Sequence, residues 1–294
     1  MTLIRLVEEG LLDLFSKGRL FGTTHTCIGQ EAIAVGVLSH LKASDIVVSN
    51  HRCHGHYIAF TDDAEGLMLE VMGRQGGVCN GKGGSQHLCT GQFFSNGILG
   101  GMVPGAVGMA LAEKRMGKDT VVVVFLGDGA LGEGLVYESL NLASLWKAPV
   151  LFVVEHNQYA QSTPTRFQMA GTVAGRFAAF GIPHAELNTN DVTVIHESAG
   201  EAVGRVRASG SPECLILHTY RLSPHSKGDD FRDPAEIAHW RENDPLKLSA
   251  AQLEAEVASR IEAECQTRVQ QAIKAASAAP FPEASEDNLS EYTS

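Results

Sequence analysis

The sequence predicts an α/β fold, a parallel sheet covered by helices on both faces. Two apolar runs, 121–126 and 149–155, are short and rich in β-branched residues, a pattern typical of strands buried on both sides. The segment between them, 133–147, places its apolar residues on one helical face, and a further strand is expected at 213–218. Strand and helix therefore alternate, as they do where helices connect parallel strands.

Local signals predict the elements of the first third of the chain. Apolar residues recur with helical spacing at 2–17 and 30–41. A short strand at 46–49 leads into a loop rich in His and Arg, and acidic residues suit the start of a helix at 62–73. The glycine-rich stretch 73–101 is expected to be a long loop that is functional or mobile.

The remainder of the sheet region follows the same alternation. Glycine and alanine in 104–116 predict a helix that packs closely on the sheet. A polar loop covers 156–171, and helices are expected at 172–180 and 191–208, before the strand at 213–218. One region therefore forms the sheet, and we predict a single α/β domain over residues 1–232.

From residue 233 onward the pattern changes to helix and polar linker, which predicts a helical C-terminal extension over 233–294. In a helix at about 250–277 an apolar residue recurs at every fourth position, so the stripe precesses around the helix and more than one surface can cover it. Its members are Leu253, Val257, Ile261, Cys265, Val269 and Ile273. Residues 278–294 combine prolines with acids and are expected to form a weakly ordered tail.

Composition excludes several classes of function. The 294 residues include 23 Lys and Arg against 34 Asp and Glu, a net charge of −11 that argues against a nucleic-acid backbone or an anionic membrane as partner. No apolar run is long enough to cross a bilayer. The first 19 residues lack the pattern of a signal peptide, and their acids disfavour a transit peptide, so the cytoplasm is the expected location.

The six cysteines include no Cys-x-x-Cys pair, and we expect them to be reduced, buried thiols. A zinc site is the alternative, because several His and Cys residues cluster in one part of the chain, although their spacing fits no standard structural zinc frame. These residues are His51, Cys53, His54, His56, Cys79, His87 and Cys89.

Polar residues follow the two central strands at their carboxyl ends. Gly127-Asp128-Gly129 comes directly after the first apolar run, and Asn157 follows the second. Ligands of parallel sheets gather at this edge, and glycines allow the backbone to approach phosphate oxygens closely. A carboxylate and an amide oxygen are ligands that Mg²⁺ shares readily with phosphates. The spacing therefore predicts a divalent cation holding a diphosphate.

With this pair the chain resembles a known family. The stretch from Gly127 to Asn157 is similar to the thiamine diphosphate motif. The whole chain resembles the alpha subunit of the thiamine-dependent decarboxylating component of 2-oxoacid dehydrogenases, whose members include the pyruvate, branched-chain 2-oxoacid and acetoin dehydrogenases. Further matching segments are Gly29-Gln30-Glu31-Ala32, His51-Arg52-Cys53-His54-Gly55, Gly81-Lys82-Gly83-Gly84-Ser85-Gln86-His87, Asn96-Gly97-Ile98-Leu99-Gly100, and Tyr220-Arg221 through His225-Ser226 to Asp229-Asp230.

The resemblance implies thiamine diphosphate and Mg²⁺ as cofactors, and a role for each matching residue. The metal ligands would be Asp128, Asn157 and the backbone carbonyl of Tyr159. His225 and His54 would be catalytic. The cofactor-binding residues would be Arg52, Gly97, Leu99, Gly127, Asp128, Gly129, Ala130, Asn157, Tyr159, Gln161 and His225. Among these, Arg52 would bind phosphate, the backbone at Gly97 and Leu99 would meet the aminopyrimidine, and Gly129 and Ala130, at the start of the following helix, would offer N–H groups to phosphate.

The resemblance also implies a partner. The glutamate that activates the cofactor in this family lies on a separate beta subunit, so an α2β2 tetramer is expected, with a lipoyl-bearing acyltransferase as a possible further partner. The glycine-rich region and the C-terminal stripe could serve such contacts. The enzyme would decarboxylate or cleave a 2-oxo acid or an acetoin-like substrate and pass the acyl unit to a lipoyl or other acceptor.

Two other functions remain open at this stage. A split-transketolase-like subunit that moves a ketol unit between sugar phosphates would share the diphosphate site, and a non-enzymatic partner-binding subunit could retain it. The chain also departs from the family pattern at His51, His156 and Gln161, and in Leu222-Ser223-Pro224, which leaves the substrate undefined. Ser226 coincides with a serine that kinases modify in mitochondrial relatives, but without a transit peptide we do not expect its phosphorylation.

Overall fold

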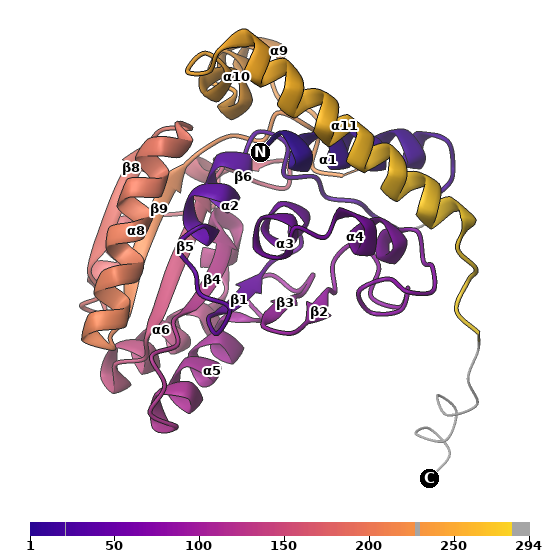
Figure 1. Cartoon of the computed structure of the whole chain (residues 1–294). Helices are drawn as coiled ribbons and strands as arrows, with labels where there is room; N and C mark the ends of the chain where they lie inside the picture. Colours follow the sequence, from indigo (N-terminus) through magenta and orange to yellow (C-terminus); the bar gives the residue numbers. More distant parts are fainter. Residues whose placement is uncertain (21, 227–229, 284–294) are drawn as a thin grey trace.

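The computed structural model describes residues 1–20, 22–226 and 230–283, and it confirms the predicted α/β class. Its main sheet has seven strands in the order β2-β3-β1-β4-β5-β9-β8 (Figure 1). All neighbours are parallel except β2 and β3. The strands are β1 (Ile46–Ser49), β2 (Cys89–Thr90), β3 (Phe93–Ser95), β4 (Val122–Gly127), β5 (Val150–His156), β8 (His184–Asn188) and β9 (Glu213–His218). A separate hairpin consists of β6 (Tyr159–Ala160) and β7 (Thr163–Pro164).

The central strands β4 and β5 separate two apolar cores. Because successive side chains of a strand point to opposite faces, Val123 and Phe125 enter one core while Val122 and Val124 enter the other. The first core is covered by α1 (Thr2–Ser16), α2 (Glu31–Leu38), α3 (His54–Thr61), α4 (Ala64–Val71) and α8 (Val192–Ser209). The second is covered by α5 (Val103–Arg115), α6 (Gly134–Trp146) and α7 (Val173–Ala178).

Helix α3 was not predicted, because its sequence was interpreted as part of a His-rich loop. The helix begins at His54 and is buried over its first five residues, so it lacks the amphipathic spacing on which the prediction relied. Its end also differs from expectation. Asp62, where we expected a helix to begin, has a φ of 56° and terminates α3, and α4 begins at Ala64 with the Asp63 carboxylate accepting a hydrogen bond from Gly66 N–H.

Two further differences concern short strands. The glycine-rich stretch contains β2 and β3, and β3 extends the sheet by pairing with β1. Strand β8 lies at the opposite edge, where alternate residues are exposed and no apolar run forms. Both segments become strands through pairing with a neighbour that is distant in sequence, and such pairing leaves a weak local signal.

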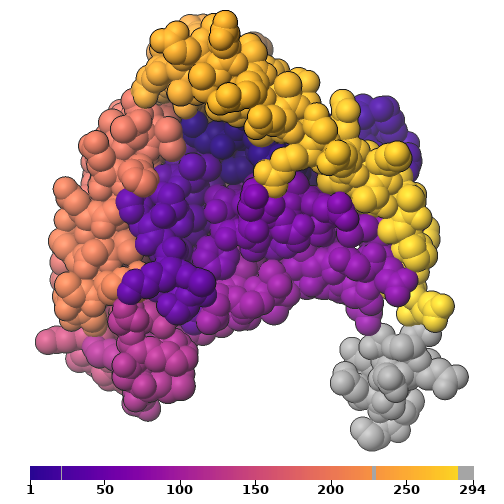
Figure 2. All heavy atoms as spheres, in the orientation of Figure 1, coloured from indigo at the N-terminus to yellow at the C-terminus, as the bar shows by residue number. Residues whose placement is uncertain are grey.

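The C-terminal residues form three helices, α9 (Pro234–Arg241), α10 (Pro245–Ala250) and α11 (Ala255–Ala278). Helix α11 lies across α1 and α4, with Val269, Ala272 and Ala276 buried (Figures 1 and 2). The first half of the predicted stripe is more open, and Leu253 is 44% exposed. Of the predicted tail, residues 284–294 lie outside the described residues. Within the described part of the chain no helix is long and apolar enough to cross a membrane.

Candidate functional site

A pocket of about 320 Å³ opens at the carboxyl ends of β4 and β5. Every residue predicted to bind cofactor lines it: Arg52, Gly97, Leu99, Gly127, Asp128, Gly129, Ala130, Asn157, Tyr159, Gln161 and His225. Four residues absent from that prediction line it as well, namely His25, His51, Gln86 and Ala160. The sheet thus brings together side chains from segments that are separated by up to 200 positions, from His25 to His225.

The register of the sheet explains how Asp128 and Asn157 meet. Gly127 at the end of β4 pairs with Glu155 in β5, so both chains leave the sheet side by side. Residues Asp128–Gly132 form a 3₁₀ turn before α6 begins, so Gly129 and Ala130 lie in that turn rather than at the helix start we expected. A Cβ at Gly129 would come within 2.9 Å of the Ala160 Cβ, so the close approach of the β6–β7 hairpin requires glycine here.

Asp128 is held by three donors. Its Oδ1 accepts the Gly129 N–H at 2.8 Å, and its Oδ2 accepts the Thr165 hydroxyl at 2.8 Å and His156 Nδ1 at 3.0 Å. The carboxylate is 3% exposed. A buried carboxylate with this many donors is fixed in orientation before any ligand binds.

Asn157 is oriented by a buried chain of polar groups. Its Nδ2 donates to Gln30 Oε1 at 3.1 Å, and Gln30 Nε2 donates to Glu155 Oε1 at 3.2 Å. Burial alone would favour the neutral form of Glu155, but His56, Asn50 and Gln30 outweigh it and lower the pKa of Glu155. Because Glu155 can only accept, it dictates the direction of both amides. Asn157 Oδ1 is therefore the atom left on the side of the Tyr159 backbone, whose N–H it accepts at 3.2 Å.

Two buried arginines lie close to these side chains: Arg52 lines the pocket, and Arg221 is near enough to Asp128 for their charges to interact. Arg52 donates to the carbonyls of Thr26 and His225 and to His225 Nδ1. It forms no salt bridge with a carboxylate of the described residues. Arg221 is 2% exposed and donates through Nη2 to Gln161 O at 2.8 Å, while its Nε and Nη1 are buried with no hydrogen-bond partner among the described residues.

The pKa values of both arginines are lowered, because burial disfavours the charged guanidinium. Burial, with the charge of Arg221 beside it, lowers the pKa of Arg52 to about 9. Burial and the nearby charge of Arg232 lower the pKa of Arg221 to about 10. Both groups remain protonated at neutral pH. Arg52 places a desolvated positive charge in the pocket, and Arg221 adds a second charge close to Asp128, with two donor atoms that lack hydrogen-bond partners among the described residues. A ligand that carries several anionic oxygens, such as a diphosphate, would compensate these charges.

Three histidine rings form the wall next to Arg52. The ring centroids of His25 lie 4.9 Å from His51 and 4.7 Å from His225. Because Arg52 Nη2 donates to His225 Nδ1 at 2.9 Å, the proton of neutral His225 is on Nε2. Burial, followed by the charge of Arg52, lowers the pKa of His51 well below its usual value. Sequence reasoning missed His25, which lies in an irregular segment before α2 and carries no periodic signal.

His54 does not line the pocket, although we predicted it as catalytic. Its fully buried ring bonds Glu8 Oε2 through Nδ1 at 2.9 Å and both oxygens of Ser85 through Nε2 at 3.0 Å. Burial opposes protonation, but the Glu8 carboxylate prevails and raises the pKa of His54. The observed contacts assign His54 a structural position between α1, α3 and the glycine-rich stretch.

The alternative zinc site is not assembled in the described residues, where no three His, Cys, Asp or Glu side chains are placed to hold a metal. The residues of that cluster have other partners. His56 contacts Glu155, and the Cys53 thiol donates to Ser85 O at 3.3 Å.

The described residues after β9 make contacts on both sides of residues 227–229. Arg232 is buried, pairs with Asp230 at 2.6 Å and donates to Arg221 O at 2.6 Å. Residues 227–229, which include Asp229 of the predicted motif, lie outside the described residues. The extension reaches the site too, since the Tyr159 hydroxyl donates to Glu236 of α9 at 2.8 Å.

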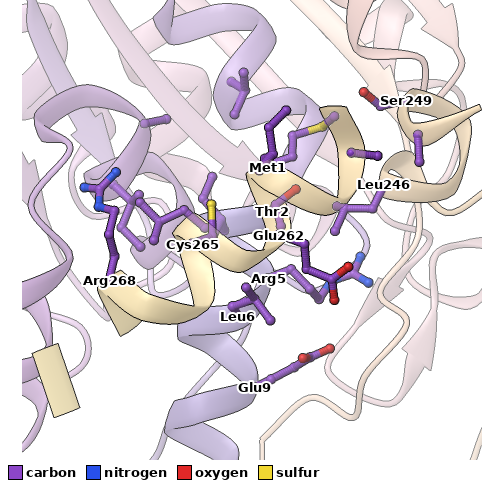
Figure 3. Close-up of a pocket in the computed structure, with 18 of the residues that line it drawn as sticks. Met1, Thr2, Arg5, Leu6, Glu9, Leu246, Ser249, Glu262, Cys265 and Arg268 are labelled. Carbon is purple, nitrogen blue, oxygen red and sulfur yellow. The ribbon is translucent and has the colours of Figure 1, made fainter. Parts of the chain in front are cut away.

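A second groove, of about 760 Å³, is formed by α1, α10 and α11 on another part of the molecule. Figure 3 shows that its labelled side chains come from both ends of the chain, among them Met1, Leu246 and Cys265. It contains none of the motif residues. The residues predicted to bind cofactor therefore line the pocket at the sheet edge and not this groove.

Comparison with known proteins agrees with the resemblance inferred from the motifs. Residues 1–285 match the family model of the dehydrogenase E1 component. The chain is 41% identical to the alpha subunit of acetoin:2,6-dichlorophenolindophenol oxidoreductase from Cupriavidus necator, over 96% of this chain and 89% of that protein. It is 36% identical to the Bacillus subtilis protein of the same name, over 97% and 89%. It is 40% identical to the pyruvate dehydrogenase E1 component subunit alpha of Rhizobium meliloti, over 86% and 75%. The predicted resemblance is confirmed, and the chain belongs to the dehydrogenase E1 component family.

Proposed function

We propose that the chain is the alpha subunit of a thiamine diphosphate-dependent dehydrogenase that acts on a 2-oxo acid or on an acetoin-like substrate. The observation that carries this proposal is the pocket itself, where the oriented Asp128 and Asn157 side chains lie with buried Arg52, and where Arg221 nearby has two unpartnered donor atoms among the described residues. Relatives named as acetoin and pyruvate enzymes support this function over that of a ketol-transferring subunit.

In this proposal the diphosphate is held from both sides. Asp128 Oδ, Asn157 Oδ1 and the Tyr159 carbonyl would bind Mg²⁺, which prefers oxygen ligands and shares them with phosphates. Arg52 and Arg221 would neutralise the outer phosphate oxygens, and the 3₁₀ turn at Gly129 and Ala130 would offer N–H groups. The backbone at Gly97 and Leu99 would meet the aminopyrimidine, and Leu99, 44% exposed, is open to a partner.

Thiamine diphosphate, when bound, supplies an electron sink for breaking the bond next to a carbonyl group. The protein contributes His225, whose ring proton in the neutral form lies on Nε2 because Arg52 donates to Nδ1. The Gln86 amide donates to His25 Nδ1 at 2.9 Å, which places the proton of neutral His25 on Nε2 as well. We assign proton transfer to and from the reacting oxygen to His225, with His25 beside it.

The proposal includes a beta subunit, since the relatives above are named as alpha subunits. That subunit would supply the acid that activates the cofactor, in an α2β2 assembly located in the cytoplasm, with a lipoyl group or another oxidant as acceptor. The Ile98 side chain, 69% exposed beside Leu99, and the half-exposed part of α11 are surfaces available for such contacts.

The decisive experiment is turnover by the co-purified αβ complex with dichlorophenolindophenol as acceptor. We expect reduction of the dye with at least one member of a panel of pyruvate, branched-chain 2-oxo acids and acetoin, and no turnover by the isolated chain. Transfer of ketol units between sugar phosphates, with no dye reduction by any member of the panel, would favour the transketolase-like alternative and reject the proposal.

The role of His225 has its own test. We expect His225→Ala to lower turnover by about 100-fold or more, the usual contribution of a positioned acid or base. Cofactor affinity should fall far less, because the metal ligands and Arg221 are retained. His87→Ala changes an exposed histidine outside the pocket and is the matched control. Turnover close to that of the wild type would remove His225 from the reaction.

A further inference from the structure

Two of the six cysteines lie at the ends of one short loop. Cys79 and Cys89 bracket residues 80–88 of the glycine-rich stretch, and this loop is wound around the carboxylate of Glu70. Four backbone N–H groups donate to that carboxylate at distances between 2.6 and 3.1 Å, those of Cys79, Gly81, Gly83 and Gly84. The position of Cys79 is therefore held from within the protein.

The sulfur of Cys79 points at the backbone of Cys89. Cys79 Sγ accepts the Cys89 N–H at 3.2 Å and lies 3.7 Å from Cys89 O and 3.4 Å from His87 O. Cys79 Sγ therefore lies next to the stretch of backbone from which the Cys89 side chain branches. Cys89 is exposed and Cys79 is half-buried, so a small reagent can reach the pair.

The other cysteines differ in both respects. Cys27, Cys53 and Cys214 are buried, and Cys265 is half-buried on α11, in the separate groove. In the described residues, none of these four sulfurs forms a hydrogen bond with the backbone of a second cysteine. The geometry singles out Cys79 and Cys89.

We propose that Cys79 and Cys89 form a reversible intrachain disulfide by exchange with a low-molecular-weight disulfide such as oxidised glutathione. The thiolate of exposed Cys89 attacks one sulfur of the small disulfide and releases one small thiol, which leaves a mixed disulfide on Cys89. Cys79 then loses its proton, attacks the Cys89 sulfur and releases the second small thiol. Two protein thiols are oxidised, and the small disulfide is reduced to two thiols.

The ring that this bond closes includes a residue of the candidate site. Gln86 lines the pocket and donates to His25 Nδ1, and its own carbonyl accepts the Ser95 hydroxyl at 2.9 Å. Oxidation removes the thiol hydrogen of Cys79, so the carbonyls of His87 and Cys89 on the same loop lose this donor. Formation of the disulfide can therefore shift the loop that positions Gln86 in the wall of the pocket.

The test uses the whole αβ complex treated with oxidised glutathione and then with N-ethylmaleimide. Trypsin cleaves after Arg74 and Lys82, so the two cysteines fall on different peptides. Mass spectrometry without reductant is expected to find residues 75–82 linked to the peptide that carries Cys89, with the loss of two hydrogens, and dithiothreitol should separate them. Cys79→Ser should instead retain glutathione on Cys89, and Cys265→Ser should leave the link intact.

Three results would overturn the proposal. They are a stable glutathione adduct on Cys89 of the wild-type chain without the link, full alkylation of both cysteines after oxidation, and a link from either cysteine to the beta subunit. Each is read from peptides of the wild-type complex, so none depends on the folding of a variant or on the activity proposed above.

Discussion

The two sides of the pocket are built differently. On the side formed by the ends of β4 and β5, the oxygens of Asp128 and Asn157 already accept hydrogen bonds. Glu155 fixes the orientation of the Gln30 amide, which in turn orients the Asn157 amide. On the arginine side, Arg221 leaves two buried nitrogen donors without partners in the described residues, and burial together with the charge of Arg221 lowers the pKa of Arg52. The first side is satisfied without a ligand, whereas the second is not.

This difference separates the two contributions to ligand binding. Groups that are already fixed bind a metal without further ordering, which favours affinity through preorganisation. Groups that are buried and unsatisfied destabilise the free protein, and a matching anion removes that cost. Substitutions on the oxygen side should therefore weaken cofactor binding with little effect on the stability of the cofactor-free protein. Substitutions on the arginine side should weaken cofactor binding while they leave that stability unchanged or raise it.

The largest effect is expected on the oxygen side. Asp128→Ala removes the charged metal ligand, so the affinity of the αβ complex for thiamine diphosphate with Mg²⁺ should fall by more than about 100-fold, beyond the loss typical of residues that only support a ligand. Calorimetry measures this affinity, and Asp13→Ala, at an exposed ion pair on α1, is the control. Unchanged affinity would mean that Asp128 is not a ligand.

The arginine side should respond with opposite signs. Arg221→Met removes two unpartnered donors and a charge that destabilises Arg52, so thermal unfolding of the cofactor-free protein should occur at the same or a higher temperature. Cofactor affinity should fall by about 10- to 100-fold, the value of charge-assisted hydrogen bonds to phosphate. Arg260→Met, at an exposed helix position, is the control. A marked loss of stability without cofactor would show that Arg221 is not held at a cost.

A smaller effect is expected behind the metal ligands. Gln30→Glu places a second carboxylate against Glu155 and removes the amide that directs Asn157, so Mg²⁺ affinity should fall by about 10-fold. Adding Glu155→Gln restores one carboxylate and one amide in exchanged positions, and part of the affinity should return. Titration of Mg²⁺ at saturating thiamine diphosphate compares the three proteins. If the double variant is no better than the single one, the Gln30 chain does not orient Asn157.

The smallest effect concerns His54, outside the pocket. Its pKa is raised in the folded state, so its protonation stabilises the fold in full below the unfolded value of about 6.5, and that contribution is lost as the pH rises through the folded pKa. His54→Gln should remove this decline above pH 6.5 while cofactor affinity stays the same. Thermal midpoints between pH 6 and 9 measure it. An equal decline in both proteins would place the titration elsewhere.

Sequence reasoning succeeded where one segment carries its own signal. The bounds of β1 and β9 and the approximate bounds of β4 and β5 follow from continuous apolar runs, because a strand buried on both faces needs them. It failed for α3 and β8, whose state depends on burial among distant neighbours and on pairing at the sheet edge. The same limit applies to His54, which we predicted to be catalytic and which lies outside the pocket, because its contacts with Glu8 and Ser85 come from two other segments.

The sequence by itself determined the class of fold, the parallel strand pair with Asp128 and Asn157 at its end, and the family, because each depends on residues close together in the chain. Only the tertiary structure decided which remote groups complete the site. His25 lines the pocket, Gln30 bonds Asn157 and Arg221 bonds Gln161, each from a segment that is far away in sequence. The physical reason is that hydrogen bonding and desolvation act over a few ångströms in space, whatever the separation along the chain.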